Sequence, residues 1–140
     1  MYFDASALVK LVVEEDGSEL ASQLWDGCDA ALSSRLAYPE VGAALAAAGR
    51  NRALTRAGLR VALDSWEDFW AAIRPVELTG VVSLLAGELA RRRALRGADA
   101  VHLASVAVLG STDIVLAVWD RRLHAGAVAE GIAVAPSTLP

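Results

Sequence analysis

The sequence predicts a single α/β domain with a parallel sheet that is covered by helices on both faces. Short apolar runs that suit buried strands alternate with longer stretches of helical composition along the whole chain. The runs at residues 1–3 and 114–118 are the most apolar, as expected for strands buried on both faces of a parallel sheet. No repeat or linker interrupts the 140 residues, an ordinary length for one domain, so we expect residues 1–140 to form one unit.

The expected strands are short. They cover residues 1–3, 30–34, 74–78, 114–118 and 132–134. Pro75 indicates that the third of these strands lies at a sheet edge, because proline has no N–H to donate to a neighbouring strand. The run 114–118 is the strongest strand signal, and Trp119 and Asp120 follow it directly.

The expected helices fill the stretches between the strands. They cover residues 5–13, 18–25, 35–50, 55–70, 79–93, 98–109 and 121–130. Ser18, Thr55 and Thr79 are predicted N-caps, because a hydroxyl at that position accepts a hydrogen bond from a free N–H of the first turn. The helices at 35–50 and 55–70 follow one another closely, and we expect them to pack as an antiparallel pair.

Composition excludes several classes of protein. The apolar fraction of 55% argues against disorder, and no run reaches the roughly 18 apolar residues of a membrane span. One cysteine, Cys28, allows no internal disulfide and fits a reducing compartment, so we expect a cytoplasmic protein without a membrane segment. The net charge of −4 does not suggest a general nucleic-acid binder, although bound divalent cations would offset it.

Four carboxylates stand out by their positions. Asp4 and Asp120 end the two most apolar strands, whereas Glu40 and Asp99 lie in the first turns of otherwise apolar helices. In an open α/β sheet, ligands bind beyond the carboxyl ends of the strands. If these two strands are neighbours, we expect all four acids to meet at one rim of the sheet.

Each acid taken alone has an ordinary structural explanation. An aspartate at the start of a helix serves as an N-cap, and a negative charge there complements the helix dipole. Four clustered carboxylates are harder to explain in this way, because like charges destabilise the fold unless cations intervene. Hard oxygen ligands without a set of His or Cys residues suit Mg²⁺ or Mn²⁺ better than zinc.

The motifs around these acids resemble the PIN-domain family. The segments are 4–10 (DASALVK), Glu40, 97–104 (GADAVHLA) and 119–123 (WDRRL), and they span the chain in the family's order. They are most similar to the VapC-type toxins of bacterial toxin–antitoxin pairs. The resemblance implies a three-layer α/β/α fold with a central five-stranded parallel sheet and a metal-dependent endoribonuclease that cleaves cellular RNA. It also implies one or two Mg²⁺ or Mn²⁺ ions held by Asp4, Glu40, Asp99 and Asp120, inhibition by a cognate antitoxin, and a homodimer.

The hydroxyl groups near the acids differ from the family's pattern. Family members often carry Thr or Ser two residues before the last acid, but here Val118 stands before Asp120, so the number of metal ions is left open. Ser6 keeps a hydroxyl beside Asp4, and we expect it to contact metal-bound water or phosphate.

Other polar and aromatic residues near the motifs have both structural and functional explanations. Arg96 and Arg121 flank the acids and are the better candidates for binding RNA phosphates, whereas Arg91–Arg93 suit the dipole at a helix C-terminus. We interpret His102 as a core or supporting residue, because a carboxylate set needs no imidazole ligand. Trp66 and Trp70 could stack RNA bases, but their helical spacing favours core, dimer or antitoxin contacts.

Two alternative functions use similar residues. A phosphatase with an aspartyl nucleophile requires a second Asp where this chain has Ser6, and a receiver domain requires a late lysine, whereas the only lysine is Lys10. A catalytically weak PIN-fold module that binds RNA or protein is the second alternative. The presence of all four acids favours the nuclease.

Overall fold

A computed structural model describes residues 1–139, and its centre is a five-stranded parallel sheet. The strands are β1 (Tyr2–Phe3), β2 (Leu32–Ser34), β3 (Arg74–Val76), β4 (Val115–Ala117) and β5 (Ala133–Ala135). Their order in the sheet is β3-β2-β1-β4-β5, with every neighbouring pair parallel. The five-stranded parallel sheet is therefore confirmed, and β3 with its proline lies at an edge, as predicted.

The strands β1 and β4 are neighbours, which is the condition on which the predicted site depended. Tyr2 pairs with Leu116 and Phe3 pairs with Ala117, so the two strands end side by side. The chain order reverses at this pair, because β2 lies on the other side of β1. Parallel sheets bind ligands at such a switch point.

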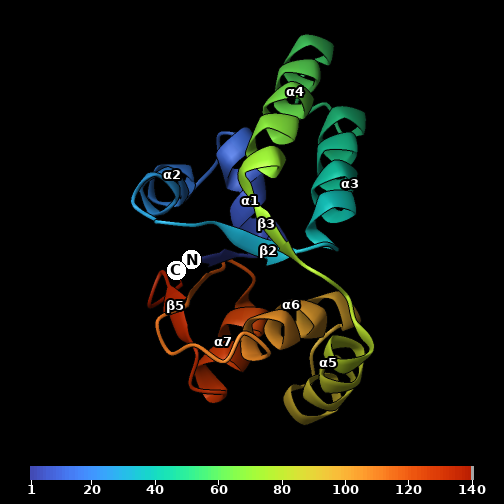
Figure 1. Cartoon of the computed structure of the whole chain (residues 1–140). Helices are drawn as coiled ribbons and strands as arrows, with labels where there is room; N and C mark the ends of the chain where they lie inside the picture. Colours follow the sequence, from blue (N-terminus) through green and yellow to red (C-terminus); the bar gives the residue numbers. More distant parts are fainter. Residues whose placement is uncertain (140) are drawn as a thin grey trace.

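Seven helices cover the two faces of the sheet in the described part of the chain. They are α1 (Ala5–Val12), α2 (Ser18–Asp26), α3 (Ala37–Arg50), α4 (Arg56–Ala72), α5 (Gly80–Arg93), α6 (Gly97–Ala107) and α7 (Arg121–Ala129). Figure 1 shows α1 to α4 on one face and α5 to α7 on the other, which confirms the three-layer arrangement. The helices α3 and α4 run side by side in opposite directions, as predicted.

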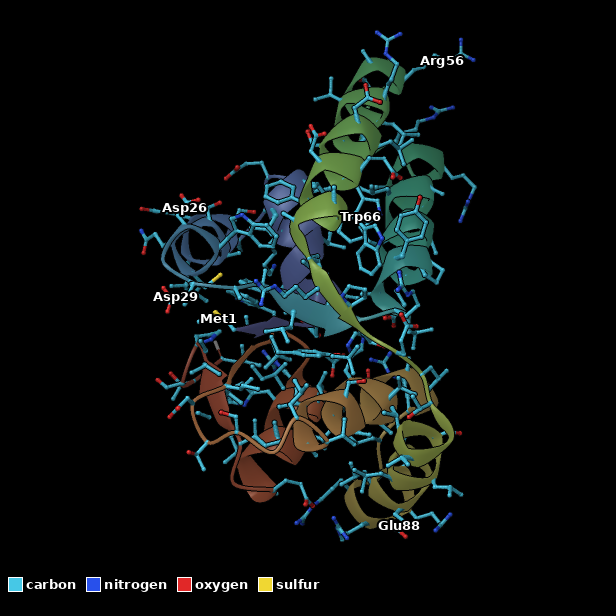
Figure 2. All side chains as sticks on the ribbon, in the orientation of Figure 1. Met1, Asp26, Asp29, Arg56, Trp66 and Glu88 are labelled. Carbon is cyan, nitrogen blue, oxygen red and sulfur yellow. The ribbon has the colours of Figure 1, made fainter. Side chains whose placement is uncertain are left out.

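The alternation of side chains along β1 divides the core into two parts. Tyr2 packs with the apolar residues of α5, α6 and α7, whereas Phe3 packs with those of α1, α3 and α4, and both side chains are fully buried. Successive residues of a strand point to opposite faces, so these two residues anchor both layers. Trp66 lies between α4 and α3 and is 2% exposed, which confirms that it is a core residue (Figure 2).

The prediction that Ser18 caps α2 is wrong. Gly17 holds the N-cap position in a left-handed conformation with φ of 92°, and Ser18 is the first helical residue. The buried Ser18 hydroxyl instead donates to the Val13 carbonyl and accepts from the Glu15 N–H, each at 3.0 Å. The caps at Thr55 and Thr79 are confirmed by hydrogen bonds from backbone N–H groups of the first turn.

The ends of some elements also differ from the predictions. The strand expected at 74–78 stops at Val76, and the helix expected from residue 35 begins at Ala37. The last strand is shifted by one residue, to Ala133–Ala135. Within residues 1–139, none of the helices combines the length and apolar character that a membrane crossing requires.

Candidate active site

Asp4 has the N-cap role that the sequence offered as its structural explanation, and it lies at the strand end where the metal site is expected. It follows β1 directly and serves as the N-cap of α1, with Oδ1 accepting from the Ala7 N–H at 2.9 Å. Its residue exposure is only 3%. Burial raises the pKa of this carboxyl group, and the nearby His102 and the hydrogen bonds from Ser6 and Ala7 oppose the rise. A buried carboxylate of this kind requires a positive partner to be ionised at low cost.

The Ser6 hydroxyl connects Asp4 to the end of β4. Ser6 Oγ lies 2.7 and 2.8 Å from the two carboxylate oxygens of Asp4, and it accepts a hydrogen bond from the Trp119 N–H at 2.8 Å. Val118 is fully buried in the apolar core between the sheet and helices α5 to α7. The hydroxyl next to Asp4 therefore comes from α1 and not from the end of β4.

Asp99 and Asp120 are brought together by one arginine. Arg96 Nε donates to Asp99 Oδ2 at 2.8 Å, and Arg96 Nη2 lies 3.3 Å from Asp99 Oδ1 and 2.6 Å from Asp120 Oδ2. Asp120 also caps α7, because its Oδ1 accepts from the Arg122 and Leu123 N–H groups. These two carboxylates share a single guanidinium cation between the start of α6 and the start of α7.

Glu40 reaches the same rim through His102. Glu40 Oε2 lies 2.6 Å from His102 Nε2, and the other ring nitrogen, Nδ1, lies 2.9 Å from the Tyr2 hydroxyl. Tyr2 and His102 are 0% and 2% exposed, and burial raises the pKa of the phenol. Because the phenol keeps its proton, it can donate to Nδ1 whenever the ring is neutral, and Nε2–H then donates to Glu40. His102 lies one helical turn after Asp99, so α6 links Glu40 to the other acids.

Comparison with known proteins shows the family to which this fold belongs. The family model of the PIN domain matches residues 1–127. The chain belongs to the PIN-domain family. It is 68% identical over 139 residues to the Mycobacterium tuberculosis proteins ribonuclease VapC45 and ribonuclease VapC49, and the match covers 99% of this chain and 96% of each relative. These relatives place it in the VapC group of the family.

Solved structures share the fold at low sequence identity. One is M. tuberculosis VapC20, described as a toxin that cleaves the sarcin–ricin loop, with a TM-score of 0.70, 18% identity and coverage of 99% of this chain and 98% of that one. Another is a toxin–antitoxin complex from Klebsiella pneumoniae, with a TM-score of 0.69, 15% identity and the same coverage. Both confirm the PIN fold that the motifs indicated.

The four acids have the oxygen donors that Mg²⁺ or Mn²⁺ prefers, although the Arg96 side chain lies between Asp99 and Asp120. The donors are carboxylate oxygens without a thiolate, as these hard cations prefer. Within residues 1–139, no three acidic, His or Cys side chains converge closely enough to hold an ion as they stand. Asp99 and Asp120 instead share the Arg96 guanidinium, which identifies their oxygens as a place where positive charge is bound. The donor atoms of these carboxylates therefore suit a metal ion, but the side chains must move closer together to hold it.

The remaining sequence candidates have different surroundings. Arg121 is exposed at the first position of α7. Arg92 and Arg93 form ion pairs with Glu130 just after α7, so these two residues do more than complement the dipole of their own helix.

Two features of this PIN site were not predicted. The sequence indicates Tyr2 only as part of an apolar strand, and no local signal indicates its hydrogen bond to a residue 100 positions away. The ion pairs of Arg96 with Asp99 and Asp120 were not predicted, and its three-residue spacing from Asp99 is the one local signal for the first pair. Binding of phosphate by Arg96 stays a prediction.

Proposed function

We propose that this chain is an endoribonuclease toxin that hydrolyses phosphodiester bonds in cellular RNA with the help of Mg²⁺ or Mn²⁺. The observation that carries the proposal is that acids from separate elements lie along the rim at the carboxyl ends of β1 and β4. Asp4 and Asp120 follow these two strands, and Arg96 joins Asp99 to Asp120. Membership of the VapC group, whose named relatives are ribonucleases, supports the same reaction.

The proposed ligands of the metal are Asp4, Glu40, Asp99 and Asp120. The ion would act as a Lewis acid that activates water and stabilises the charge developing on the phosphate. The chain's own residues orient these carboxylates. Ser6 holds Asp4 through both of its oxygens, and His102 holds Glu40. Such support keeps ligands in a productive geometry.

A groove lined by arginines supports RNA as the substrate. It has a volume of about 820 Å³ and lies between the end of α5 and the exposed side of α7. The arginines that line it are Arg92, Arg93, Arg121 and Arg122. The last two follow Asp120 directly in the sequence, so the groove begins beside the acids. Guanidinium groups bind phosphates well, and a local basic surface on a chain of net charge −4 favours a polyanion at this place.

The proposed protein partners are a cognate antitoxin and a second copy of the chain. Group membership supports both, and an apolar hollow of about 390 Å³ offers a surface for such a contact. Tyr38, Trp70 and Leu78 are among the residues that line it. We therefore retain Trp70 as a candidate contact residue. Light scattering of the purified chain, alone and with its antitoxin, tests both assemblies.

The test of the nuclease is cleavage of total cellular RNA by antitoxin-free protein with Mg²⁺, with Mn²⁺ and with EDTA. The Asp4→Asn protein, purified in parallel, reports any contaminating nuclease. Metal-dependent cleavage that is lost in the variant supports the proposal. Equal cleavage by the parent and by the Asp4→Asn and Asp99→Asn proteins refutes it. RNA binding without cleavage at any metal concentration favours the alternative, a catalytically weak binding module.

A further inference from the structure

The carboxylate oxygens of Asp99 and Asp120 are divided between two kinds of partner, backbone N–H groups and the Arg96 guanidinium. Asp120 Oδ1 is committed to the backbone, because it accepts from the Arg122 and Leu123 N–H groups at 2.9 and 3.0 Å. Asp120 Oδ2 and both oxygens of Asp99 point instead to the Arg96 guanidinium. Of the four oxygens of Asp99 and Asp120, the three that the backbone leaves for a cation are therefore the ones that Arg96 already holds.

A divalent ion and the guanidinium compete for the space beside these oxygens. Mg²⁺ binds carboxylate oxygens at about 2.0–2.1 Å and keeps several waters around it, which fills the space beside them. The Arg96 nitrogens lie 2.6 Å from Asp120 Oδ2 and 2.8 Å from Asp99 Oδ2. A metal ion that draws these two acids together displaces the side chain that now bridges them.

The Arg96 side chain is placed so that it can leave without unfolding the helix. Its side chain is 60% exposed, whereas those of Asp99 and Asp120 are 10% and 27% exposed. The residue is the N-cap of α6 through its backbone, since its carbonyl accepts from the Ala100 N–H at 2.9 Å, and its side chain makes no cap hydrogen bond. Rotation of the side chain therefore leaves the start of α6 intact.

We propose that Arg96 competes with the metal ion for Asp99 and Asp120. The Arg96 guanidinium holds these two carboxylates until a divalent cation takes its place. The inference rests on the proposed metal-dependent function and adds a control of metal loading to it. In the metal-free protein, Arg96 neutralises carboxylates that would otherwise repel one another. Once displaced, its guanidinium lies next to the acids and is available to a substrate phosphate, as the sequence suggested.

The direction in which loss of the Arg96 charge changes the affinity for metal distinguishes competition from a supporting role. If Arg96 competes, removal of its charge tightens metal binding. If Arg96 instead positions the acids for the metal, removal weakens binding. Exposed ion pairs are individually weak, so loss of the two pairs is expected to lower the dissociation constant for Mn²⁺ by about two- to thirtyfold.

The experiment is a calorimetric titration of RNA-free protein with Mn²⁺ alone. The parent chain is compared with Arg96→Gln and Arg96→Lys, and with Arg56→Gln as the matched control. Arg56 is exposed at the far end of α4, away from the sheet (Figure 2). We expect Arg96→Gln to bind Mn²⁺ most tightly, and Arg96→Lys to fall between it and the parent, because an ammonium lacks the fork that bridges two carboxylates. Arg56→Gln should bind like the parent.

The rise in melting temperature caused by Mn²⁺ is a second readout, and it should be larger in Arg96→Gln than in the parent. Equal or weaker Mn²⁺ binding in both Arg96 variants, with normal binding by the parent, overturns the competition and leaves the proposed function intact. Failure of the parent and of every variant to bind Mn²⁺ overturns the metal-dependent function together with the competition. Circular dichroism of each variant establishes that it is folded, and Arg96→Lys preserves the test if Arg96→Gln is not.

Discussion

Replacement of Asp4 by Asn should stabilise the metal-free protein. The Asp4 side chain is buried, and burial raises the pKa of its carboxyl group, so the ionised form is costly in the fold. Asn has the same shape and is an equally good N-cap, so the hydrogen bond from the Ala7 N–H is kept. The Ser6 hydroxyl can accept from the new amide group in place of donating to the carboxylate.

The expected gain is about 1 kcal/mol at pH 7, the usual scale for removing a functional but destabilising feature. For a chain of 140 residues this corresponds to a rise in melting temperature of about 3–4 °C. The gain depends on pH. A carboxyl group with a raised pKa in the fold takes up more protons there than in the unfolded chain, so the parent loses stability as pH rises through that pKa. Below the ordinary Asp pKa of 3.8, the group is protonated in both states and the difference between the proteins should vanish.

Differential scanning calorimetry in EDTA at several pH values measures this gain. Asp29→Asn is the matched control, since Asp29 is exposed beyond α2 (Figure 2) and its neutralisation should change little. Saturating Mg²⁺, at about 100 times the dissociation constant, should then stabilise the parent by about 2.7 kcal/mol and the Asp4→Asn protein far less. An Asp4→Asn protein that melts below the parent at pH 7 in EDTA would refute the reasoning.

Three further substitutions test individual contacts. Tyr2→Phe leaves the buried Nδ1 of His102 without its partner, and urea unfolding should show a loss of about 1–3 kcal/mol. Ser6→Ala removes the hydroxyl that donates to Asp4 and accepts a hydrogen bond from the Trp119 N–H. Because Asp4 loses this support, RNA cleavage should fall at least about tenfold while circular dichroism stays unchanged. Gly17→Ala places a Cβ 2.6 Å from Trp119 Nε1 at a φ of 92°, and thermal melting should show a loss of at least about 1 kcal/mol.

Local signals in the sequence were sufficient where the partner is close along the chain. The caps at Thr55 and Thr79 were predictable because a hydroxyl and the N–H that it binds are three residues apart. The prediction failed at Ser18, because Gly17 can adopt a left-handed conformation and the hydroxyl of Ser18 closes the preceding turn instead. Local competition of this kind is not visible in a cap pattern alone.

The sequence by itself determined the parallel sheet, the two helical layers and the placement of Asp4 and Asp120 at strand ends. Apolar runs and helical stretches report burial and periodicity directly, so these features follow from neighbouring residues. The PIN motifs also point to Glu40 and Asp99 as candidate ligands.

Only the tertiary structure decided how the acids are held. Glu40 and His102 are 62 residues apart, and Arg96 and Asp120 are 24 apart, so no periodic pattern links them. These pairs form because the end of β4, the start of α6 and the first turn of α3 arrive at one rim. Side-chain partners at that rim depend on the distances between elements, and the packing of both layers on the sheet sets those distances.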